Sequence, residues 1–348
     1  MTPPAVGTAL RRDSRPSRLC LRRLLLGASL LATFTLHAAA PTHEIALLIG
    51  APGEPAYAEN FSAAARAWQN AAERAGAALT TIGLSSDSDA SATDDRTQLQ
   101  TWLAGRTQTS DTPSPAAATP LWIVYIGHGT HDARETRLNL RGPDVTAREL
   151  AAWLAPLTRP LVFIHGGSAG APFINALSGP ERIIISATRS GNELNYARFG
   201  EHFANAVANP AADIDQDGQT SLLEAFVTAA QQVQAFYAEN GRLATEHALI
   251  DDNGDKQGTP AEWFRGTRVQ RRPQNSTAQP DGQNARLVAL IPTESERALT
   301  PAQREQRDAL ERELEALRAQ KSSLPEDDYY HQLESLFRRL GALYRADT

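Results

Sequence analysis

The feature that most constrains the fold is a series of short apolar segments in which hydrophobic residues do not alternate with polar ones. Five such segments occur before residue 190: "HEIALLIGA", "ALTTIGL", "LWIVYIGHGT", "RPLVFIHGG" and "ERIIISATR". Segments with helical periodicity lie between them, such as residues 57–76, which end at Gly76, and "TARELAAWL", a helix that Thr146 caps. Strands that are apolar on both faces and separated by helices form parallel sheets covered on both sides. The sequence therefore predicts an α/β fold with a mostly parallel sheet.

The first 39 residues have the pattern of a secretory signal peptide. Six arginines precede the apolar run 24–36, and Ala38, Ala39 and Ala40 follow it. The run is too short to span a bilayer as a helix. We therefore expect residues 1–39 to be removed on export, which places the mature protein in the periplasm or outside the cell, with no membrane span.

Loss of this segment changes both charge and cysteine content. Removal of its six arginines and one aspartate leaves 28 basic and 39 acidic residues, a net charge of about −11. Such a charge disfavours nucleic acid as a partner. The only cysteine, Cys20, is lost as well. The exported chain would then contain neither a thiol nor a disulfide.

The alternation of apolar strands and helices ends after residue 265. We expect one domain over residues 40–265, a polar linker over 266–284, and a short strand with a helical hairpin over 285–348. Thr300 and Pro301 are typical of a helix start. Apolar residues at helical spacing predict the two facing stripes of the hairpin, which are Leu310, Leu314 and Leu317 in the first helix and Leu333, Leu336, Phe337, Leu340 and Leu343 in the second.

Two side chains with catalytic potential follow neighbouring predicted strands. His128 lies between Gly127 and Gly129, and Ser168 lies in "GGSAG", which fits the G-x-S-x-G pattern of serine esterases. A histidine and a hydroxyl at adjacent strand ends can form a base-activated nucleophile. The alternative is a glycine-rich turn in which Ser168 caps the helix "APFINAL".

The order of several motifs resembles the caspase and legumain superfamily of cysteine peptidases. "VYIGHGT" is similar to its His-Gly strand end, and the next strand end there carries a cysteine in a pattern like E-A-C-x-S-G. "RIIISATRSGNELNYARFGEHFANAV", "DIDQDGQTSLLEAF" and "SLPEDDYYHQLESL" resemble later segments of bacterial exported, legumain-type members. The resemblance implies a caspase-like three-layer sandwich over residues 40–265, followed by the hairpin.

The same resemblance assigns site residues. His128 takes the position of the catalytic histidine and Ser168 that of the nucleophilic cysteine, while an alignment slipped by one residue places Gly167 there. Gly129 and Gly167 would supply oxyanion-binding amides. Arg189 would line the cleft and bind a carboxylate, with helix capping or a surface ion pair as its alternatives.

The absence of a cysteine from the exported chain lowers the peptidase activity that we expect. A serine hydroxyl is far less acidic than a thiol and needs a well-oriented base. We therefore expect a peptidase homologue that is catalytically impaired or inactive, with a peptide or protein ligand possible. The alternative is an active serine-type peptidase or esterase that uses Ser168 and His128.

An acidic segment matches the twelve-residue calcium loop of EF-hands. Its potential ligands are Asp213, Asp215, Asp217, the carbonyl of Gln219, Ser221 and Glu224, and Gly218 makes the turn. We expect a structural Ca²⁺ ion, the alternative being a capped acidic turn.

Two weaker patterns also contain potential ligands. Residues 250–260 form a second acidic stretch, for which a solvated turn is expected. His128, His131 and His165 could bind Zn²⁺, although ordinary polar roles beside a cleft are favoured.

Overall fold

The computed structural model describes residues 43–84, 93–107, 119–132, 134–271, 273 and 279–345. The expected signal peptide lies outside these residues. By their internal contacts, residues 40–348 form one compact unit. Within the described residues, no helix is both long and apolar enough to cross a membrane.

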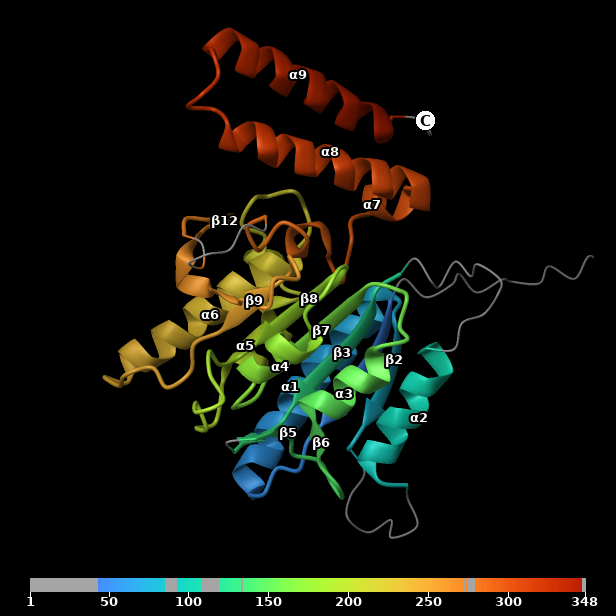
Figure 1. The fold of residues 1–348 in the computed structure, drawn as a ribbon, viewed down its shortest axis with the longest axis vertical. Helices are drawn as coiled ribbons and strands as arrows, with labels where there is room; N and C mark the ends of the chain where they lie inside the picture. Colours follow the sequence, from blue (N-terminus) through green and yellow to red (C-terminus); the bar gives the residue numbers. More distant parts are fainter. Residues whose placement is uncertain are drawn as a thin grey trace, which may run out of the picture. The chain divides into compact units, whose positions relative to one another are not determined.

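A seven-stranded sheet forms the centre of the fold and confirms the predicted α/β class (Figure 1). Five strands are parallel, and two antiparallel strands extend one edge. In spatial order the strands are β10 (Thr259–Pro260), β9 (Leu249–Asp251), β8 (Arg182–Ser186), β7 (Leu161–His165), β3 (Leu121–Ile126), β1 (Glu44–Ile49) and β2 (Ala78–Ile82). The central strands β3 and β7 are buried along their whole length, which explains their unbroken apolar sequence.

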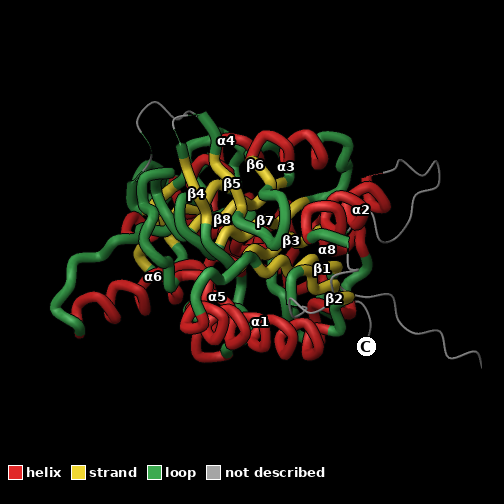
Figure 2. Tube along the Cα trace, turned by 90° about the horizontal axis from the view of Figure 1, so that it is seen from below, coloured by secondary structure: helices red, strands yellow, loops and turns green. Residues whose placement is uncertain are grey.

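Helices cover both faces of this sheet, as Figure 2 shows for α1 and α5 on one side and α3 and α4 on the other. The first layer packs around Trp68, Phe203 and Phe226, and the second around Trp102, Leu150 and Phe173. The six helices are α1 (Pro55–Ala75), α2 (Asp95–Thr107), α3 (Ala147–Leu154), α4 (Ala171–Leu177), α5 (Phe199–Ala206) and α6 (Leu222–Glu239). The molecule therefore has the three layers expected.

The helix ends follow local sequence signals. Pro55 occupies the first turn of α1, and Gly76 ends the helix with a left-handed φ of 65°. Thr146 begins α3 in a capping box with Glu149. The expected caps at Gly76 and Thr146 are thus confirmed.

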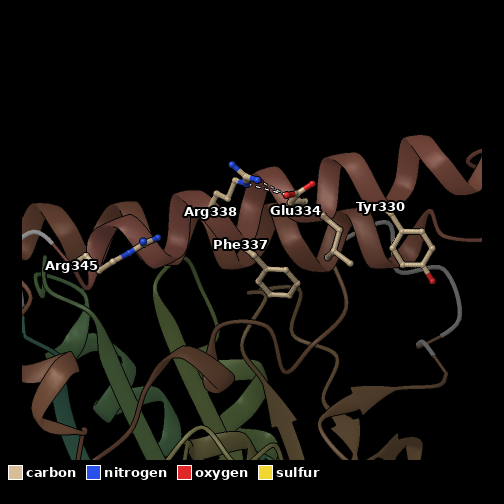
Figure 3. Close-up of a pocket in the computed structure, with 6 residues that line it drawn as sticks. Tyr330, Glu334, Phe337, Arg338 and Arg345 are labelled. Atoms are coloured by element: carbon tan, nitrogen blue, oxygen red, sulfur yellow. Dashed lines mark hydrogen bonds and ion pairs between the residues drawn. The ribbon is translucent and has the colours of Figure 1, made fainter.

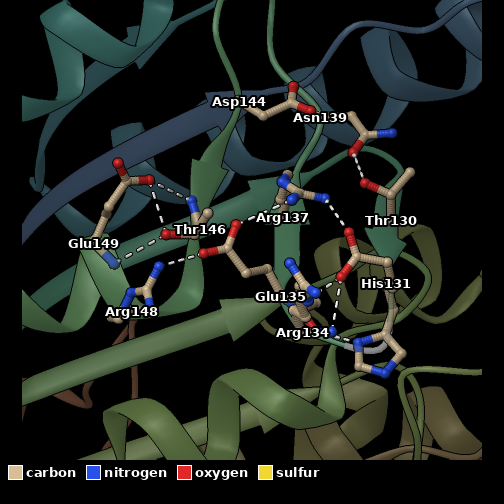
Figure 4. Close-up of polar contacts among 12 residues, drawn as sticks. Thr130, His131, Arg134, Glu135, Arg137, Asn139, Asp144, Thr146, Arg148 and Glu149 are labelled. Carbon is tan, nitrogen blue, oxygen red and sulfur yellow. Dashed lines mark hydrogen bonds and ion pairs between the residues drawn. The ribbon is translucent and has the colours of Figure 1, made fainter.

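A small antiparallel sheet begins directly after His128. It contains β4 (Gly129–His131), β5 (Thr136–Leu138) and β6 (Val145–Thr146). Ion pairs of Arg137 with Asp132 and Glu135 hold its turn together, and Arg148 reaches Glu135 as well (Figure 4). This sheet fixes the backbone on both sides of Gly129.

The stretch 266–284, expected as a linker, contains ordered structure. β11 (Phe264–Arg265) and β12 (Arg268–Val269) form a short hairpin, and Asp281 is buried against β9 and β10. Instead of a strand after residue 285, the chain forms the 3-10 turn Ala285–Leu287 and one bridge between Ala289 and Ser221. Ala289 pairs with a single residue, and one isolated bridge does not form a strand.

The expected helical hairpin is present at the C-terminal end. It consists of α8 (Pro301–Ala319) and α9 (Glu326–Leu343), preceded by the short α7 (Glu294–Ala298). The hairpin has its own apolar core, to which the leucines of both predicted stripes contribute. The expectation was wrong for Phe337, which is 50% exposed because it lies on a side of α9 that α8 does not cover. Arg286 joins it to the preceding chain through Glu311 and Glu315.

Candidate functional site

The two candidate catalytic residues follow adjacent parallel strands. Tyr125 of β3 lies opposite His165 of β7, so both chains leave the sheet at the same edge. The Tyr125 hydroxyl donates to the carbonyl of His128 at 2.5 Å and accepts from Asn139 N at 3.0 Å. Tyr125 is buried, and it holds the backbone of the His128 turn in a fixed position.

The imidazole of His128 faces aromatic residues. Its ring centroid lies 4.7 Å from that of Tyr57 and 5.3 Å from that of Phe61, both on α1, and 6.0 Å from that of Tyr196. Nε2 lies 3.3 Å from the carbonyl oxygen of Pro52. Partial burial lowers the pKa of His128, so the neutral imidazole is favoured.

Ser168 is bound to the neighbouring backbone. Its side chain accepts from Gly129 N at 3.1 Å and donates to Gly129 O at 3.2 Å. The residue is only 1% exposed. Within the described chain, Ser168 makes no hydrogen bond to a histidine. Nor does it cap α4, whose N-cap residue is Gly170 and which has no side-chain cap.

The backbone amides expected to bind an oxyanion already have partners. Gly129 N donates to Ser168 Oγ, and Gly167 N donates to His165 Nδ1 at 3.3 Å. The ring of His165 is fully buried, and burial lowers its pKa to about 4. A neutral His165 accepts from Gly167 N in one tautomer and donates to Gly167 O, 3.2 Å from Nδ1, in the other. Gly129 N is bonded to Ser168 Oγ in either case.

The alternative nucleophile position, Gly167, has no room for a side chain. A Cβ atom there would lie 2.0 Å from Gly127 O and 2.9 Å from Gly127 C. The backbone after β7 thus passes directly against the backbone after β3. A residue with a side chain at this position would require the two strand ends to separate.

Arg189 belongs to a polar cluster that the sequence analysis missed. Its Nε lies 3.3 Å from Glu193 Oε1, and the same oxygen lies 2.7 Å from His247 Nδ1. The Glu193 carbonyl also accepts from Ala169 N at 2.9 Å. Glu193 therefore joins the turn after β7 to the chain before β9. No sequence pattern marks it, because apart from the nearby Arg189 its partners Ala169 and His247 are 24 and 54 residues away in the chain.

A cavity of about 430 Å³ opens beside this cluster. Its walls are mainly apolar side chains of α5, α6 and the β11 region, with the polar residues Gln231, Gln234, Glu246, His247 and Glu262. Ligand pockets commonly have volumes of about 300–1,000 Å³. Glu246 caps α5 by accepting from Arg198 N and Phe199 N, so it is structural within this wall.

Several solved structures are remotely similar to this chain. Similar solved structures include the Drosophila initiator caspase Dronc, with 12% identity, a TM-score of 0.40, and coverage of 73% of this chain and 96% of that one. Caspase-1 from Spodoptera frugiperda has 11% identity, a TM-score of 0.37, and coverage of 62% and 91%. Raptor from Chaetomium thermophilum has 12% identity, a TM-score of 0.32, and coverage of 49% and only 18%. Neither the protein-family models nor the curated proteins compared with this sequence match it. The α/β fold itself is defined by the strand order of this chain.

The acidic loop brings three carboxylates together. Ligand oxygens of Asp213, Asp215 and Glu224 all lie within 4.8 Å of one another, the only such metal-ligating group among the described residues. Two oxygens bound to one Ca²⁺ at 2.3–2.6 Å are at most about 5 Å apart. The three carboxylates therefore fit one calcium ion.

The same loop also has the bonds of a capped turn. Glu224 Oε1 accepts from Ile214 N and Asp215 N, while Oε2 accepts from the amide and hydroxyl of Ser221. Asp213 accepts from Asp217 N and Gly218 N. Glu224 thus ties the loop to the first turn of α6, and both sequence interpretations share this geometry.

Charge repulsion distinguishes the loop from an ordinary cap. Partial desolvation of this solvent-exposed group and the neighbouring carboxylates of Glu224, Asp217 and Asp213 raise the pKa of Asp215 to about 6. Burial and nearby carboxylates also raise the pKa of Asp217, against the bonds from Gln219. A cation would relieve this repulsion.

The three candidate zinc ligands have separate environments. His131 Nδ1 lies 2.6 Å from Thr136 Oγ1 within the small sheet. His165 is enclosed by Tyr125, Phe163 and Phe173. His128 faces Pro52. Among the described residues, these histidines form no metal-ligating group.

Proposed function

We propose that this protein is an exported homologue of caspase- and legumain-like peptidases that has lost turnover and acts by binding a peptide or protein. The observation that carries the proposal is the Ser168 hydroxyl, which is buried and bonded in both directions to Gly129. A nucleophile needs a base within hydrogen-bond reach and an exposed approach. Ser168 has neither among the described residues.

The binding role is supported by the cavity beside Glu193. It lies next to the loop after β8, where the superfamily resemblance places the cleft, and its apolar lining suits a peptide side chain. The amides of Gly129 and Gly167 are bonded within the chain, whereas this cavity has space for a ligand group. Ligand recognition is therefore the function that the geometry favours.

A calcium ion in the acidic loop belongs to this proposal as a structural element. Asp213, Asp215 and Glu224 would hold it, and its charge would offset the repulsion among the carboxylates. The loop also contacts the C-terminal region, because Thr293 N donates to Gln219 Oε1 at 3.3 Å. The ion would thus stabilise both α6 and the start of α7.

The loss of turnover is tested with a fluorophosphonate probe and intact-mass measurement. We expect no adduct on the wild-type protein, with or without Ca²⁺, and no difference from Ser168→Ala. A stoichiometric adduct that Ser168→Ala abolishes would show an active serine hydrolase instead.

A cysteine at position 168 measures how accessible this position is to a reagent in solution. In a Cys20→Ala background, Ser168→Cys gives the chain one thiol. We expect iodoacetamide to modify it at least ten times more slowly in the native protein than in urea, because position 168 is buried. Rapid native modification would contradict the closed site.

A further inference from the structure

Helix α9 has an aromatic face that α8 does not cover. Tyr329, Leu336, Leu340 and Leu343 are buried on the side that forms the hairpin core. Tyr330 and Phe337 instead project together from an adjacent side and are 48% and 50% exposed (Figure 3). Large aromatic side chains exposed side by side indicate a contact surface.

Charged residues along the edge of this face form a symmetric series. Asp327 and Glu334 are followed by Arg338 and Arg345, with spacings of seven, four and seven residues. At about 100° per residue these four positions share one edge of the helix. The series reads acid, acid, base, base, and its midpoint is Leu336. Reversal of the helix direction therefore exchanges acids for bases.

Gly341 lies on the same face, and no close contact within the described chain requires a glycine at this position. A Cβ atom there would contact only the tip of Arg345, at 3.3 Å. Glycine inside a helix costs about 1 kcal/mol relative to alanine. The missing side chain instead allows a neighbouring helix to approach closely.

From these features we propose that the α9 face binds a second copy of this protein, with the two α9 helices antiparallel about a two-fold axis that crosses the interface at the level of residue 336. Asp327 then lies opposite Arg345 of the second copy. Glu334 and Arg338 pair with each other within one α9, and this exposed ion pair lies opposite the same pair of the second copy, with each acid next to a base. Each Tyr330 ring lies over Gly341 of the other helix, and the two Phe337 rings meet near the axis. A two-fold interface is self-complementary, as this charge series requires.

The proposed interface is small and charge-balanced. Two acids and two bases on each face cancel locally, so the acidic net charge of the chain does not oppose this contact. Two 18-residue helices bury less than the roughly 1,200–2,000 Å² of stable complexes. We therefore expect reversible dimers at micromolar concentrations. The inference is independent of whether Ser168 is catalytic.

Sedimentation equilibrium of the full chain tests the dimer. The average mass should rise from the monomer value toward twice that value as concentration increases through the micromolar range. Phe337→Asp should weaken association at least tenfold. Leu243→Asp, at a 90% exposed position outside α9, is the matched control and should leave association unchanged. A wild-type protein that stays monomeric, or a dimer that Phe337→Asp leaves intact, would overturn the proposal.

Charge exchange tests the orientation of the helices. Glu334→Arg alone and Arg338→Glu alone each place like charges opposite one another and should be monomeric. An equimolar mixture of these two variants should dimerise again, because each then faces opposite charges. Arg339→Glu, which removes an exposed pair with Glu313 on another side of α9, should have no effect. Folded single variants, checked by circular dichroism, that fail to associate on mixing would refute the antiparallel register.

Discussion

At the scale of single residues, the glycines after β3 and β7 are explained by close packing of the backbone. A Cβ atom at Gly129 would lie 2.2 Å from Ser168 O, and one at Gly167 would lie 2.0 Å from Gly127 O. The strand ends are therefore in direct contact.

The contact leads to a stability prediction. Gly167→Ala should destabilise the protein by at least about 2 kcal/mol, because the new methyl group overlaps a backbone carbonyl that has little freedom to move. Urea unfolding measures the change. Gly105→Ala is the control: nothing lies within 4 Å of its Cβ position in α2, and it should stabilise by about 0.5–1 kcal/mol. Equal stability of wild type and Gly167→Ala would show that the strand ends can separate.

At the scale of elements, the acidic loop and α6 form one unit. Ser221 caps α6 in a capping box with Glu224, whose other oxygen accepts from the amides of Ile214 and Asp215. The helix start therefore positions one carboxylate of the group. Asp215 is exposed and is repelled by its neighbours.

Asp215→Asn should have opposite effects with and without calcium. Without Ca²⁺ the change removes a repelled charge, so the melting temperature should rise slightly, by an amount equivalent to roughly 1 kcal/mol or less because solvent screens the group. Added Ca²⁺ should stabilise the wild type but stabilise the variant much less. Differential scanning calorimetry in chelator and in millimolar Ca²⁺ measures both. Identical calcium responses of the two proteins would rule out Asp215 as a ligand.

At the scale of the whole molecule, two buried aspartates attach the segment before the hairpin to the sheet. Asp252 accepts from the amides of Gly282, Asn284 and Ala285. Asp281 accepts from Asp252 N and from the Thr259 hydroxyl. Burial raises the pKa of both acids, but three amide donors oppose the shift at Asp252, so Asp281 is the acid that keeps its proton to the higher pH. Burial and the Asp252 charge raise the pKa of Asp281 to about 8.

This pair predicts an unusual pH dependence. Between about pH 4 and pH 8 the folded state keeps a proton on Asp281 that the unfolded chain releases, so stability should fall as pH rises, by up to about 1.4 kcal/mol per unit. Asp281→Asn removes this titrating group and therefore its pH-dependent contribution to the free energy of unfolding. Its stability relative to wild type should therefore increase from pH 5 to pH 8 in urea unfolding. A difference that stays constant or shrinks with pH would contradict the protonated pair.

Much of the architecture was predictable because it depends on local sequence. Unbroken apolar strands, the caps at Gly76 and Thr146, and the leucine stripes of the hairpin determined the layers and helix positions. The acidic loop was predictable for the same reason, since its ligands lie within twelve residues.

Contacts between distant segments were decided only by the tertiary structure. The sequence placed His128 and Ser168 at adjacent strand ends, but the direction of the hydroxyl depends on how closely Gly129 and Gly167 allow the chains to approach. The expected solvated turn at 250–260 was wrong for Asp251 and Asp252, which are buried. Their burial depends on residues 281–285, about thirty positions later. Local patterns carry no information on such distant partners. Burial by these partners changes the pKa and the hydrogen bonding of a side chain, so its role cannot be predicted without them.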